Sequence, residues 1–334
     1  MTNKPSVINK LFNNTEVAFS LKKDSELERA YFLFKMIANE PLVRIGTAMT
    51  NFAIKAHLPV EGLIRATVFD HFCGGVSEED CVSVIDTMYT KKVCSVLDYS
   101  VEGKEDEAQF DAAFQMTVKL LDFVNEKDAI PFSDAADDLV TEMMRKYNTE
   151  KAIVFNTLQM YRWDRLDYLQ QLHKEAEEKG FYVGMKLVRG AYMEKENDRA
   201  NANDYSSPIC ESKVATDRNF DAGVIYMIEN LGRLSLFAGT HNEDSSYLVM
   251  QLMQQNSVPT NSDNVWFGQL YGMSDHISYN LSEAGYNVAK YLPFGPVKDV
   301  MPYLIRRAEE NTSVAGQTTR ELNLLKEERK RRKL

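Results

Sequence analysis

From Cys94 onward, the sequence alternates short apolar runs with stretches whose apolar residues recur every three or four positions. The first pattern is typical of buried strands and the second of amphipathic helices. It predicts the strands Cys94–Val101, Ala129–Phe132, Ala152–Met160, Tyr182–Gly190, Leu234–Thr240, Val265–Leu270 and Val288–Leu292. The helices predicted between them are Ala108–Asn125, Ala136–Tyr147, Asp164–Lys179, Phe220–Leu231, Ser245–Gln255 and Ile277–Ala284, with a last one in Val297–Asn311. Strict alternation of strand and helix implies right-handed crossovers and a parallel sheet.

The segment before the first strand lacks this alternation. Apolar positions at helical spacing predict a helix over Asp24–His57 with Ser25 as its cap, and Gly74–Glu79 predicts a turn that leads into another helix. Within the later part, Glu194–Cys210 is rich in Asn, Asp and Ser and predicts a long loop after a strand.

The number of strand–helix units decides the fold class. Seven units approach the eight of a closed barrel, and the glycine motifs of nucleotide-binding open sheets, GxGxxG and GxxxxGK[ST], are absent from the sequence. We therefore predict an α/β fold, a (βα)8-type barrel. Three segments are expected: an N-terminal helical arm over residues 1–93, the barrel over 94–315 and a charged C-terminal tail over 316–334.

Composition narrows the class of protein. The 334 residues carry a net charge of −10, which argues against nucleic acid as the main partner because phosphate binding needs a basic field. The sequence has no apolar run long enough to span a bilayer and no secretory signal. The cysteines 73, 81, 94 and 210 show no metal-ligand spacing, so we expect reduced, buried thiols in a cytoplasmic protein.

The basic run Lys326–Leu334 follows acidic and apolar residues. We expect it to be a solvated helix end. The sharper alternative is contact with a membrane surface, which would place the protein peripherally on the inner face of the membrane.

The segment Lys186–Tyr192, KLVRGAY, is the strongest candidate for chemistry. Lys186 interrupts an apolar strand, and a buried cation is costly unless something uses its charge. Gly190 at the strand end lets a ligand approach the backbone, and ligands collect at the C-terminal ends of parallel strands. The segment therefore predicts the floor of a site for an electron-rich or anionic group. An edge strand with a snorkelling lysine explains the pattern equally well.

Further polar side chains interrupt the strands near their C-terminal ends, where a barrel interior normally carries branched apolar residues. They are Asp98, Tyr99, Asn156, Thr157, Gln159, Lys186, Arg189, Thr240, His241, Asn242, Gln269, Lys290 and Tyr291. Their convergence on one rim predicts a large polar ligand. The motifs HExxH and GxSxG are absent from the sequence, which argues against metal-assisted or serine-triad hydrolysis, and we expect no metal.

Arg306 and Arg307 follow the last predicted strand. In a helix that starts near Pro302 they would lie in the first two turns, where the helix dipole favours an anion. Tyr303 and Glu310 would lie one turn to either side of the pair. Arginines bind carboxylates through paired hydrogen bonds, so the pair predicts a small carboxylate substrate. A surface Arg–Glu ladder is the alternative for an isolated pair.

Several segments together resemble the monofunctional, FAD-dependent proline dehydrogenase (proline oxidase) family. They are Leu97–Glu102, Phe155–Gln159, Lys186–Tyr192, Ala238–Asp244, Phe267–Met273, Tyr291–Pro296 and Tyr303–Asn311, in the family's order. The resemblance covers the chain from about Leu97 to Asn311. It implies a distorted (βα)8 barrel that oxidises L-proline to 1-pyrroline-5-carboxylate, the first step of proline catabolism to glutamate, with FAD as cofactor and a quinone as electron acceptor.

The resemblance also implies roles for single residues. The implied flavin contacts are Gln159, Lys186, Val188, Arg189, Gly190, Ala191, Thr240 and His241, together with Glu310, which would also steady the last helix. Lys186 is implied near flavin N5, where a cation stabilises developing negative charge. Arg306 and Arg307 are implied to clamp the proline carboxylate, and the implied walls of the proline ring are Tyr192, Leu270, Tyr291 and Tyr303. The catalytic set would be Lys186, Tyr291, Arg306 and Arg307.

The sequence departs from the family at the Phe132–Ser133 junction. In the family a second strand carries a carboxylate-binding lysine, and a third strand carries an aspartate that supports the arginines. Here Ala129–Phe132 resembles the start of that second strand and Ser133–Asp138 the helix after the third. About one βα unit, roughly 30 or more residues, is therefore missing with both side chains. A barrel cannot absorb a lost strand locally, so we expect a gap between Cys94–Val101 and Ala152–Met160 and much weakened or absent turnover.

Two alternatives stay open. One is a pseudoenzyme that keeps the barrel, with or without the flavin, but cannot oxidise proline. The other is a non-flavin barrel enzyme, such as an aldolase or isomerase, that forms a Schiff base through Lys186. The colour of the purified protein separates the second from a flavoenzyme, because flavin is yellow and a Schiff-base barrel is colourless.

Overall fold

A computed structural model describes residues 7–56, 58–100, 133–134, 137–190, 193–313 and 317–334. The chain divides into two compact units. Unit 1 comprises residues 1–131, 269–283 and 289–334, and unit 2 comprises residues 132–268 and 284–288.

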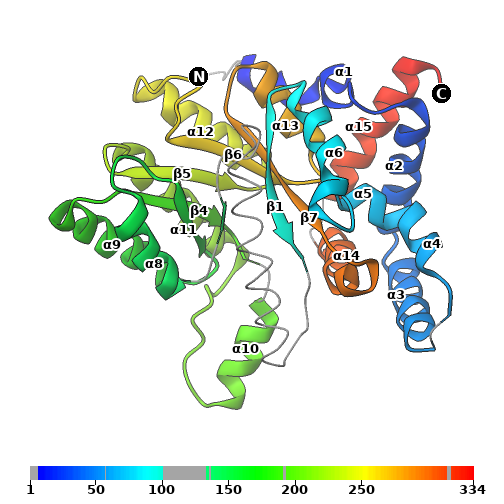
Figure 1. Cartoon of the computed structure of the whole chain (residues 1–334), viewed down its shortest axis with the longest axis horizontal. Coiled ribbons are helices and arrows are strands. Elements are labelled where there is room, and N and C mark those ends of the chain that lie inside the picture. The colour runs from blue at the N-terminus through cyan, green and yellow to red at the C-terminus, as the bar shows by residue number, and fades with distance from the viewer. Residues whose placement is uncertain (1–6, 57, 101–132, 135–136, 191–192, 314–316) are drawn as a thin grey trace. The chain divides into compact units, whose positions relative to one another are not determined.

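The strands confirm the predicted α/β class. They are β1 (Val93–Tyr99), β2 (Ser133–Asp134), β3 (Val154–Gln159), β4 (Val183–Val188), β5 (Leu234–Gly239), β6 (Val265–Leu270) and β7 (Val288–Phe294), in the order β1-β7-β6-β5-β4-β3-β2. Each pair of neighbours from β2 to β6 is parallel, as the alternation with helices requires (Figure 1). The strand order ends in β1 on one side and β2 on the other. This order is consistent with the predicted break between Cys94–Val101 and Ala152–Met160.

Along the chain, helices precede, separate and follow these strands. In the described ranges they are η1 (Val7–Asn13), α1 (Thr15–Ala18), α2 (Asp24–Ile37), α3 (Glu40–Lys55), α4 (Glu61–Ile64), the π-helical turn η2 (Arg65–Phe69), α5 (Asp70–Phe72), α6 (Glu78–Tyr89), α8 (Asp137–Tyr147), α9 (Arg165–Lys179), α10 (Met193–Ala202), α11 (Lys213–Glu229), α12 (Glu243–Gln255), α13 (Asp275–Glu283), α14 (Val297–Ser313) and α15 (Gln317–Arg332). None of these helices combines the length and the apolar run needed to cross a bilayer.

Short polar side chains fix where several helices begin. Ser77, Ser212 and Asn242 precede α6, α11 and α12, and the side-chain oxygen of each accepts a hydrogen bond from a backbone N–H in the first turn. At the other end of α9, Gly180 has a φ of 78°, a left-handed conformation that ends the helix and that glycine adopts without strain.

In unit 2, the side chain of Asn148 forms hydrogen bonds with the backbone at the start of two neighbouring strands. Asn148 follows α8 and is fully buried. Its Nδ2 donates hydrogen bonds to the carbonyls of Val154 (2.9 Å) and Tyr182 (3.0 Å). Its Oδ1 accepts from the N–H groups of Ile153 (3.0 Å) and Val154 (2.8 Å). One amide therefore satisfies backbone groups at the start of both β3 and β4, the strands that carry Gln159 and Lys186.

We predict that Asn148→Ala lowers the free energy of unfolding by about 2–4 kcal/mol, because it removes four hydrogen bonds and leaves their backbone partners buried without replacement. The matched control is Asn256→Ala, since Asn256 is exposed and its Nδ2 makes one bond, to the carbonyl of Leu252 at 2.9 Å. That variant should lose less than about 1 kcal/mol. Urea denaturation measures both. Equal losses in the two variants would contradict the role given to Asn148.

In unit 1, the C-terminal helix α15 packs beside the N-terminal helix α2, where Figure 1 shows red against blue. Leu324 and Leu325 of α15 are buried in an apolar cluster with Phe19, Leu27 and Phe34. The two ends of the chain are thus joined by burial of apolar surface, which is the main favourable term in folding.

Ion pairs complete this contact. Arg329 pairs with Glu28 at 2.5 Å and Arg332 with Asp24 at 3.0 Å. Within α15, Arg332 also pairs with the buried Glu328 at 2.7 Å. The basic run Lys326–Leu334 is therefore the end of a packed helix, which confirms the helix-end interpretation. Contact of this run with a membrane stays a prediction.

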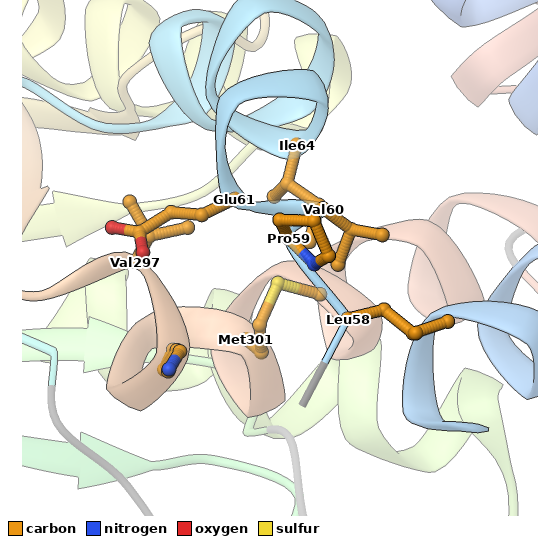
Figure 2. A pocket seen from close by; sticks show the side chains of 8 residues that line it. Leu58, Pro59, Val60, Glu61, Ile64, Val297 and Met301 are labelled. Atoms are coloured by element: carbon orange, nitrogen blue, oxygen red, sulfur yellow. The ribbon is translucent and has the colours of Figure 1, made fainter. Parts of the chain in front are cut away.

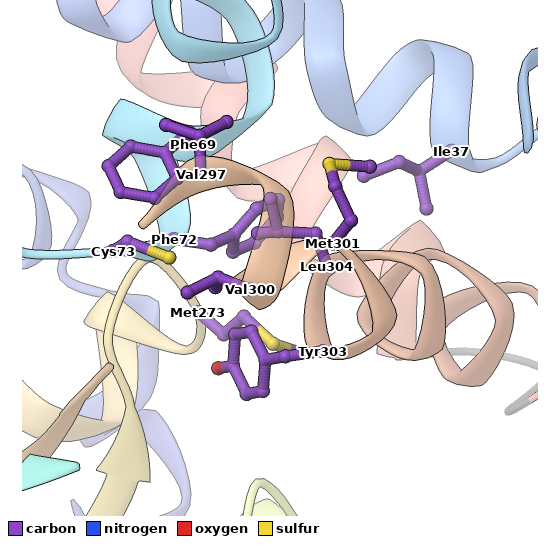
Figure 3. Close-up of a cluster of buried hydrophobic side chains, with 10 residues drawn as sticks. All are labelled: Ile37, Phe69, Phe72, Cys73, Met273, Val297, Val300, Met301, Tyr303 and Leu304. Carbon is purple, nitrogen blue, oxygen red and sulfur yellow. The ribbon is translucent and has the colours of Figure 1, made fainter. Parts of the chain in front are cut away.

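A second cluster in unit 1 surrounds the first half of α14. Its buried members are Ile37, Phe69, Phe72, Cys73, Met273, Val297, Val300, Met301, Tyr303 and Leu304 (Figure 3). Tyr303 lies at the edge of the cluster in Figure 3, on the helix that also carries the two arginines. The cluster packs α14 against η2 and α5 of the N-terminal arm.

The structure corrects the prediction for residues 24–57. One helix was expected, and the chain instead forms α2 and α3, which are separated at Ala38 and Asn39. Pro41 has no backbone N–H, so it cannot continue α2 but fits the first turn of α3. Ser25 is not the cap, because α2 begins at Asp24 and its N-cap residue is Lys23, whose backbone N–H donates to the Glu26 carboxylate at 2.8 Å.

Two further predictions were wrong. Ser133 and Asp134 form a strand, β2, in register with Val154 and Phe155 of β3, and the helix begins only at Asp137. The expected loop Glu194–Cys210 contains most of α10, because its Glu, Arg and Ala residues are strong helix formers. The predicted strand Ala129–Phe132 and helix Ala108–Asn125 lie outside the described residues.

The cysteines agree with the expected buried thiols at three of four positions. Cys73, Cys81 and Cys94 are buried and unbonded to one another, and Cys210 is half-buried. Burial raises the pKa of the Cys81 thiol to about 12 and that of Cys94 to about 11. Thiols with such raised pKa values are poor nucleophiles at neutral pH.

Candidate functional site

In unit 2, the C-terminal ends of β3 and β4 bring several predicted flavin contacts together. Gln159 lies opposite Val188, and Thr157 lies opposite Lys186. Residues two apart in a strand share a face, so these side chains line one face of the sheet. All four are partly exposed, whereas Leu187 between the two β4 residues is fully buried. This face is therefore accessible to a ligand.

Arg189 is held by several partners at once. Its Nε donates to Asp217 at 2.6 Å, its Nη1 to Thr240 at 3.1 Å and its Nη2 to Ser245 at 3.0 Å. The guanidinium carbon lies 4.5 Å from the ring centroid of Phe220. These contacts fix a positive charge beside Thr240 and the N-terminus of α12. A guanidinium has five N–H groups, so it retains donor capacity for an anionic ligand.

The β5–α12 junction adds the next predicted contacts. The backbone N–H of Thr240 donates to the carbonyl of Gly268 at 3.0 Å, and its Oγ1 accepts from the N–H of Asn242 at 3.1 Å. Asn242 in turn caps α12. His241 lies between these anchored residues and is half-buried. The junction thus places the Thr240 hydroxyl against the Arg189 guanidinium, with His241 next in the chain.

Two glycines keep the backbone close to neighbouring side chains. Gly190 has a φ of 113°, and a Cβ there would lie 1.5 Å from the ring of Tyr161. At Gly239 a Cβ would lie 2.9 Å from the Cγ1 of Val188. Only glycine fits either position. Ala191, the remaining predicted contact of this segment, lies outside the described residues.

In unit 1, Tyr303, Arg306 and Arg307 come together on α14. The guanidinium carbons of Arg306 and Arg307 lie 5.9 and 5.0 Å from the Tyr303 ring centroid. Arg307 is only 7% exposed and Tyr303 only 3%. The alternative interpretation, a surface ladder of Arg and Glu side chains, is therefore wrong for Arg307. A buried cation stacked on an aromatic face is well suited to bind an anion.

Contrary to the prediction from the sequence, the helix dipole does not set the environment of Arg306 and Arg307. The helix α14 begins at Val297 and contains Pro302, so Arg306 and Arg307 lie in its third turn. The dipole effect fades within the first turn. Stacking and burial, rather than the helix end, set the environment of the arginines. Tyr192 and the side chain of Glu310 lie outside the described residues.

Two of the predicted proline-ring walls are joined through the β6–α13 loop. Leu270 ends β6 and packs against the cluster that contains Tyr303. The next residue, Tyr271, donates its N–H to the carbonyl of Tyr291 on β7 at 2.9 Å. Leu270 is therefore linked on one side to Tyr303 and on the other to Tyr291.

A buried ionic network lies under this loop. The Lys290 ammonium, fully buried, pairs with Asp275 at 2.8 Å, and the other carboxylate oxygen of Asp275 pairs with Lys22 at 3.0 Å. Burial alone would raise the pKa of the Asp275 carboxyl, but the two ammonium groups outweigh it and hold that pKa well below its ordinary value. Sequence reasoning noted Lys290 in its strand but missed Lys22 and Asp275, which are far from it in the chain.

His71 binds the same loop from the N-terminal arm. Its Nε2 donates to the carbonyl of Gly272 at 3.0 Å. Gly272 has a φ of 78°, and a Cβ there would lie 2.2 Å from the His71 carbonyl oxygen. Burial, reinforced by the nearby Lys22 ammonium, lowers the pKa of the His71 imidazole from 6.5 to about 3. The ring is therefore neutral at physiological pH.

This lowered pKa predicts a pH dependence of stability. Between pH 6.5 and about 4 the unfolded chain binds a proton at His71 and the folded chain does not, so stability falls as the pH falls. One such group contributes a slope of up to about 1.4 kcal/mol per pH unit. His71→Gln, whose amide can still donate to Gly272, should flatten the slope in this window. Urea denaturation as a function of pH measures it.

The fall in stability below about pH 4 should remain in the His71→Gln variant, because it comes from carboxylates such as Asp275 whose pKa is lowered by folding. An unchanged slope between pH 6.5 and 4 would show that His71 is protonated in the folded protein.

Unit 1 also contains a small apolar hollow of about 130 Å³ between α4 and the start of α14 (Figure 2). It is lined by Leu58, Pro59, Val60, Glu61, Ile64, Val297, Lys298 and Met301. No residue predicted to bind flavin or proline lines it. The hollow is therefore not part of the candidate site.

Comparison with known proteins identifies the family. The sequence profile described as proline dehydrogenase matches residues 132–320, more than half of the chain. The chain is also 31% identical to the carbapenem antibiotics biosynthesis protein CarD of Pectobacterium carotovorum subsp. carotovorum, over 90% of the chain and 94% of that protein. The chain belongs to the proline dehydrogenase family, a family of oxidoreductases.

Other relatives are much longer than this chain. It is 40% identical to mitochondrial proline dehydrogenase 1 of Homo sapiens over 58% of the chain, but this match covers 33% of the human protein. It is 39% identical to hydroxyproline dehydrogenase of Xenopus laevis over 60% of the chain and 44% of that protein. The chain thus spans less than half the length of these two relatives.

Solved structures confirm the fold class. Proline utilization A from Bdellovibrio bacteriovorus superposes with a TM-score of 0.65 at 18% identity, over 94% of this chain and 40% of that one. The protein of the same name from Corynebacterium freiburgense gives a TM-score of 0.62 at 18% identity, over 86% and 34%. At this level of identity the likeness shows the fold, a distorted α/β barrel.

The comparison with CarD also bears on the predicted deletion. The alignment runs over 362 positions but takes up only 90% of the 334 residues of this chain, so roughly 60 positions of the alignment hold no residue of the chain. The family profile begins at residue 132, next to the predicted junction. At roughly 60 of the aligned positions, CarD therefore holds a residue and this chain does not.

Proposed function

We propose that the chain binds FAD non-covalently and oxidises L-proline to 1-pyrroline-5-carboxylate, with a quinone as the electron acceptor. The observation that carries the proposal is the pairing of Arg306 and Arg307 on the ring of Tyr303, with Arg307 buried. This arrangement would suit a carboxylate, and the chain belongs to the proline dehydrogenase family.

The arginines would bind the carboxylate of proline. Charge-assisted hydrogen bonds in a buried environment are stronger than those in water, and a guanidinium can form two of them to one carboxylate. Stacking on Tyr303 limits the rotation of both guanidinium groups, so less ordering is needed when the substrate binds. Leu270, Tyr291 and Tyr192 would wall the apolar ring.

The residues of unit 2 fit a flavin by their chemistry. Lys186 and Arg189 offer positive charge, while Gln159, Thr240 and His241 offer further donors, and the exposed face of β3 and β4 is open beside them. An isoalloxazine ring carries carbonyl and ring-nitrogen acceptors, and its dinucleotide carries phosphates. When bound, FAD would accept the electrons that proline loses. Val188, Gly190 and Ala191 would contribute backbone contacts, and Glu310 a contact from α14.

The proposed electron acceptor would be reached from the membrane surface, so we propose a peripheral location on its inner face. The arginines 329 and 332 are engaged in ion pairs within unit 1. The exposed Lys326, Lys330 and Lys333 would therefore supply the basic contact.

We predict that Arg307→Met raises the Michaelis constant for proline by about one to two orders of magnitude, because the lost charge-assisted bonds are worth roughly 1.5–3 kcal/mol. FAD content should change little. The control is Arg65→Met in the same unit, whose side chain is 51% exposed and pairs loosely with Asp70 at 3.7 Å. Steady-state kinetics with a dye acceptor measures both. Unaltered kinetics in Arg307→Met would remove the carboxylate role.

We predict that the purified chain takes up FAD and turns yellow, and that acid precipitation releases the flavin. Lys186→Met should weaken FAD binding by roughly tenfold or more, since it removes a cation from the site. Lys179→Met should not, because that side chain is 57% exposed and pairs with Glu175 on α9. Fluorescence titration of the flavin gives the affinities. A colourless protein that binds no FAD would favour the Schiff-base alternative.

A catalytically impaired protein is the second candidate, and the roughly 60 unmatched alignment positions favour it. The lysine and aspartate that the family resemblance implies would be absent with them. Proline-dependent dye reduction by the 334-residue chain separates the two candidates. A turnover number in the usual enzyme range of about 1–10³ per second would exclude impairment. FAD binding without turnover would support it.

A further inference from the structure

We propose that Lys290 is a positioning residue for the proline site, which sets the places of Leu270 and Tyr291 by holding the β6–α13 loop. This inference rests on the proposed function, because it assigns a role in shaping the pocket that proline would enter. Lys290 would touch neither substrate nor flavin.

The geometry of its ammonium group carries the proposal. Lys290 Nζ donates to the carbonyl of Leu270 at 3.4 Å and to that of Met273 at 2.8 Å, and it pairs with the carboxylate of Asp275 at 2.8 Å. An ammonium has three N–H groups, and these three acceptors use all of them. They lie at the first, fourth and sixth residues of a six-residue stretch, so one cation spans the whole loop.

The loop has no simple alternative conformation while this charge is in place. Lys290 is fully buried, and a buried cation without acceptors is very costly. Asp275 is only 4% exposed and depends on both Lys290 and Lys22 for its charge balance. Any shift of the loop would therefore leave a charge unpaired in the interior.

Two further contacts restrain the middle of the loop. His71 donates to the carbonyl of Gly272, and the N–H of Ser274 donates to both carboxylate oxygens of Glu321 at 3.1 and 3.0 Å. Glu321 is 3% exposed and belongs to α15. The N-terminal arm, α15 and β7 thus all bind one loop. Lys290 of β7 is the residue whose side chain binds the Leu270 carbonyl, at the beginning of the loop.

The loop is connected directly to both proposed walls. Leu270 is its first residue, and its carbonyl is an acceptor of the Lys290 ammonium. Tyr291 follows Lys290 in β7, so the two side chains point to opposite faces of the strand. The carbonyl of Tyr291 also accepts from Tyr271 N. A change at Lys290 would therefore shift Leu270 and Tyr291 relative to each other.

A role in stability alone is the competing explanation, and it makes a different prediction. Buried ion pairs are often replaced by apolar residues without loss of stability, whereas removing one partner is strongly destabilising. Lys290→Met removes one member of a network of three charges, because Asp275 also pairs with Lys22. The triple variant Lys22→Met/Asp275→Leu/Lys290→Met removes the whole network. The triple variant should recover the thermal stability that the single variant loses, while the loop still lacks its three-point anchor.

The test measures ring-size selectivity in the FAD-loaded full chain. The probes are tetrahydrofuran-2-carboxylate and tetrahydropyran-2-carboxylate, five- and six-membered ring acids whose ring oxygen prevents oxidation. Calorimetry gives the dissociation constant of each. In the triple variant we expect about tenfold weaker binding of the five-membered acid and little change for the six-membered one, because misplaced walls no longer match the smaller ring. FAD affinity should be unchanged.

The control is Lys35→Met, an exposed lysine in α2 of the same unit, which should alter neither constant. A triple variant that regains stability and keeps the wild-type ratio of the two constants would overturn the positioning role. Arg307→Met should weaken both acids equally, because it acts on the carboxylate. If the wild-type chain binds neither acid, the proposed function fails, and the inference fails with it. If Arg307→Met has its effect and Lys290 has none, only the inference fails.

Discussion

An ammonium group that leaves water needs an acceptor for each of its N–H groups, and in this protein the β6–α13 loop supplies all three to Lys290. Much of unit 1 follows from that requirement. Asp275 must lie within reach of the ammonium, Lys22 must balance the second carboxylate oxygen, and Gly272 must take a left-handed conformation so that the loop can turn. The N-terminal arm and α15 are then held near the loop by His71 and Glu321.

The candidate substrate and flavin sites also depend on positive charges that the protein holds in place. Arg307 is buried on the ring of Tyr303, and its planar guanidinium matches the geometry of a carboxylate. In unit 2, Arg189 is fixed by Asp217, Thr240 and Ser245, so its charge is already oriented. Preorganised charges of this kind contribute most to catalysis when nothing must rearrange during the reaction.

The parallel strands and most helices of the second half of the chain were predictable, because their apolar periodicity is strong and their ends carry Gly, Asn or Ser. The position of Gln159, Lys186 and Thr240 near one another followed from the rule that parallel strands end on the same side. The break before Pro41 was visible in the sequence but was outweighed by helical periodicity on either side. The strand β2 has only two residues, Ser133 and Asp134, and no apolar pattern marks it.

The network around Lys290 was not predictable from local sequence. Its partners Lys22 and Asp275 are separated from it by long stretches of chain, and a charged residue at the start of a helix, such as Asp275, normally indicates only a favourable helix end. The sequence predicted that Arg306 and Arg307 bind an anion, but it attributed this partly to the helix dipole. The pair is special because of Tyr303 and burial, not because of the helix dipole.

The central claim is that L-proline gives its electrons to a flavin bound by this chain. Anaerobic mixing of the FAD-loaded chain with L-proline, followed by the visible absorbance of the flavin, tests it in a single turnover without any acceptor. We predict slow loss of the flavin absorbance with L-proline, because the lysine and aspartate that the family resemblance implies are expected to be missing. We predict none with D-proline, whose carboxylate and ring cannot both occupy a site built for the other enantiomer. Absorbance that stays unchanged at saturating L-proline would contradict the account.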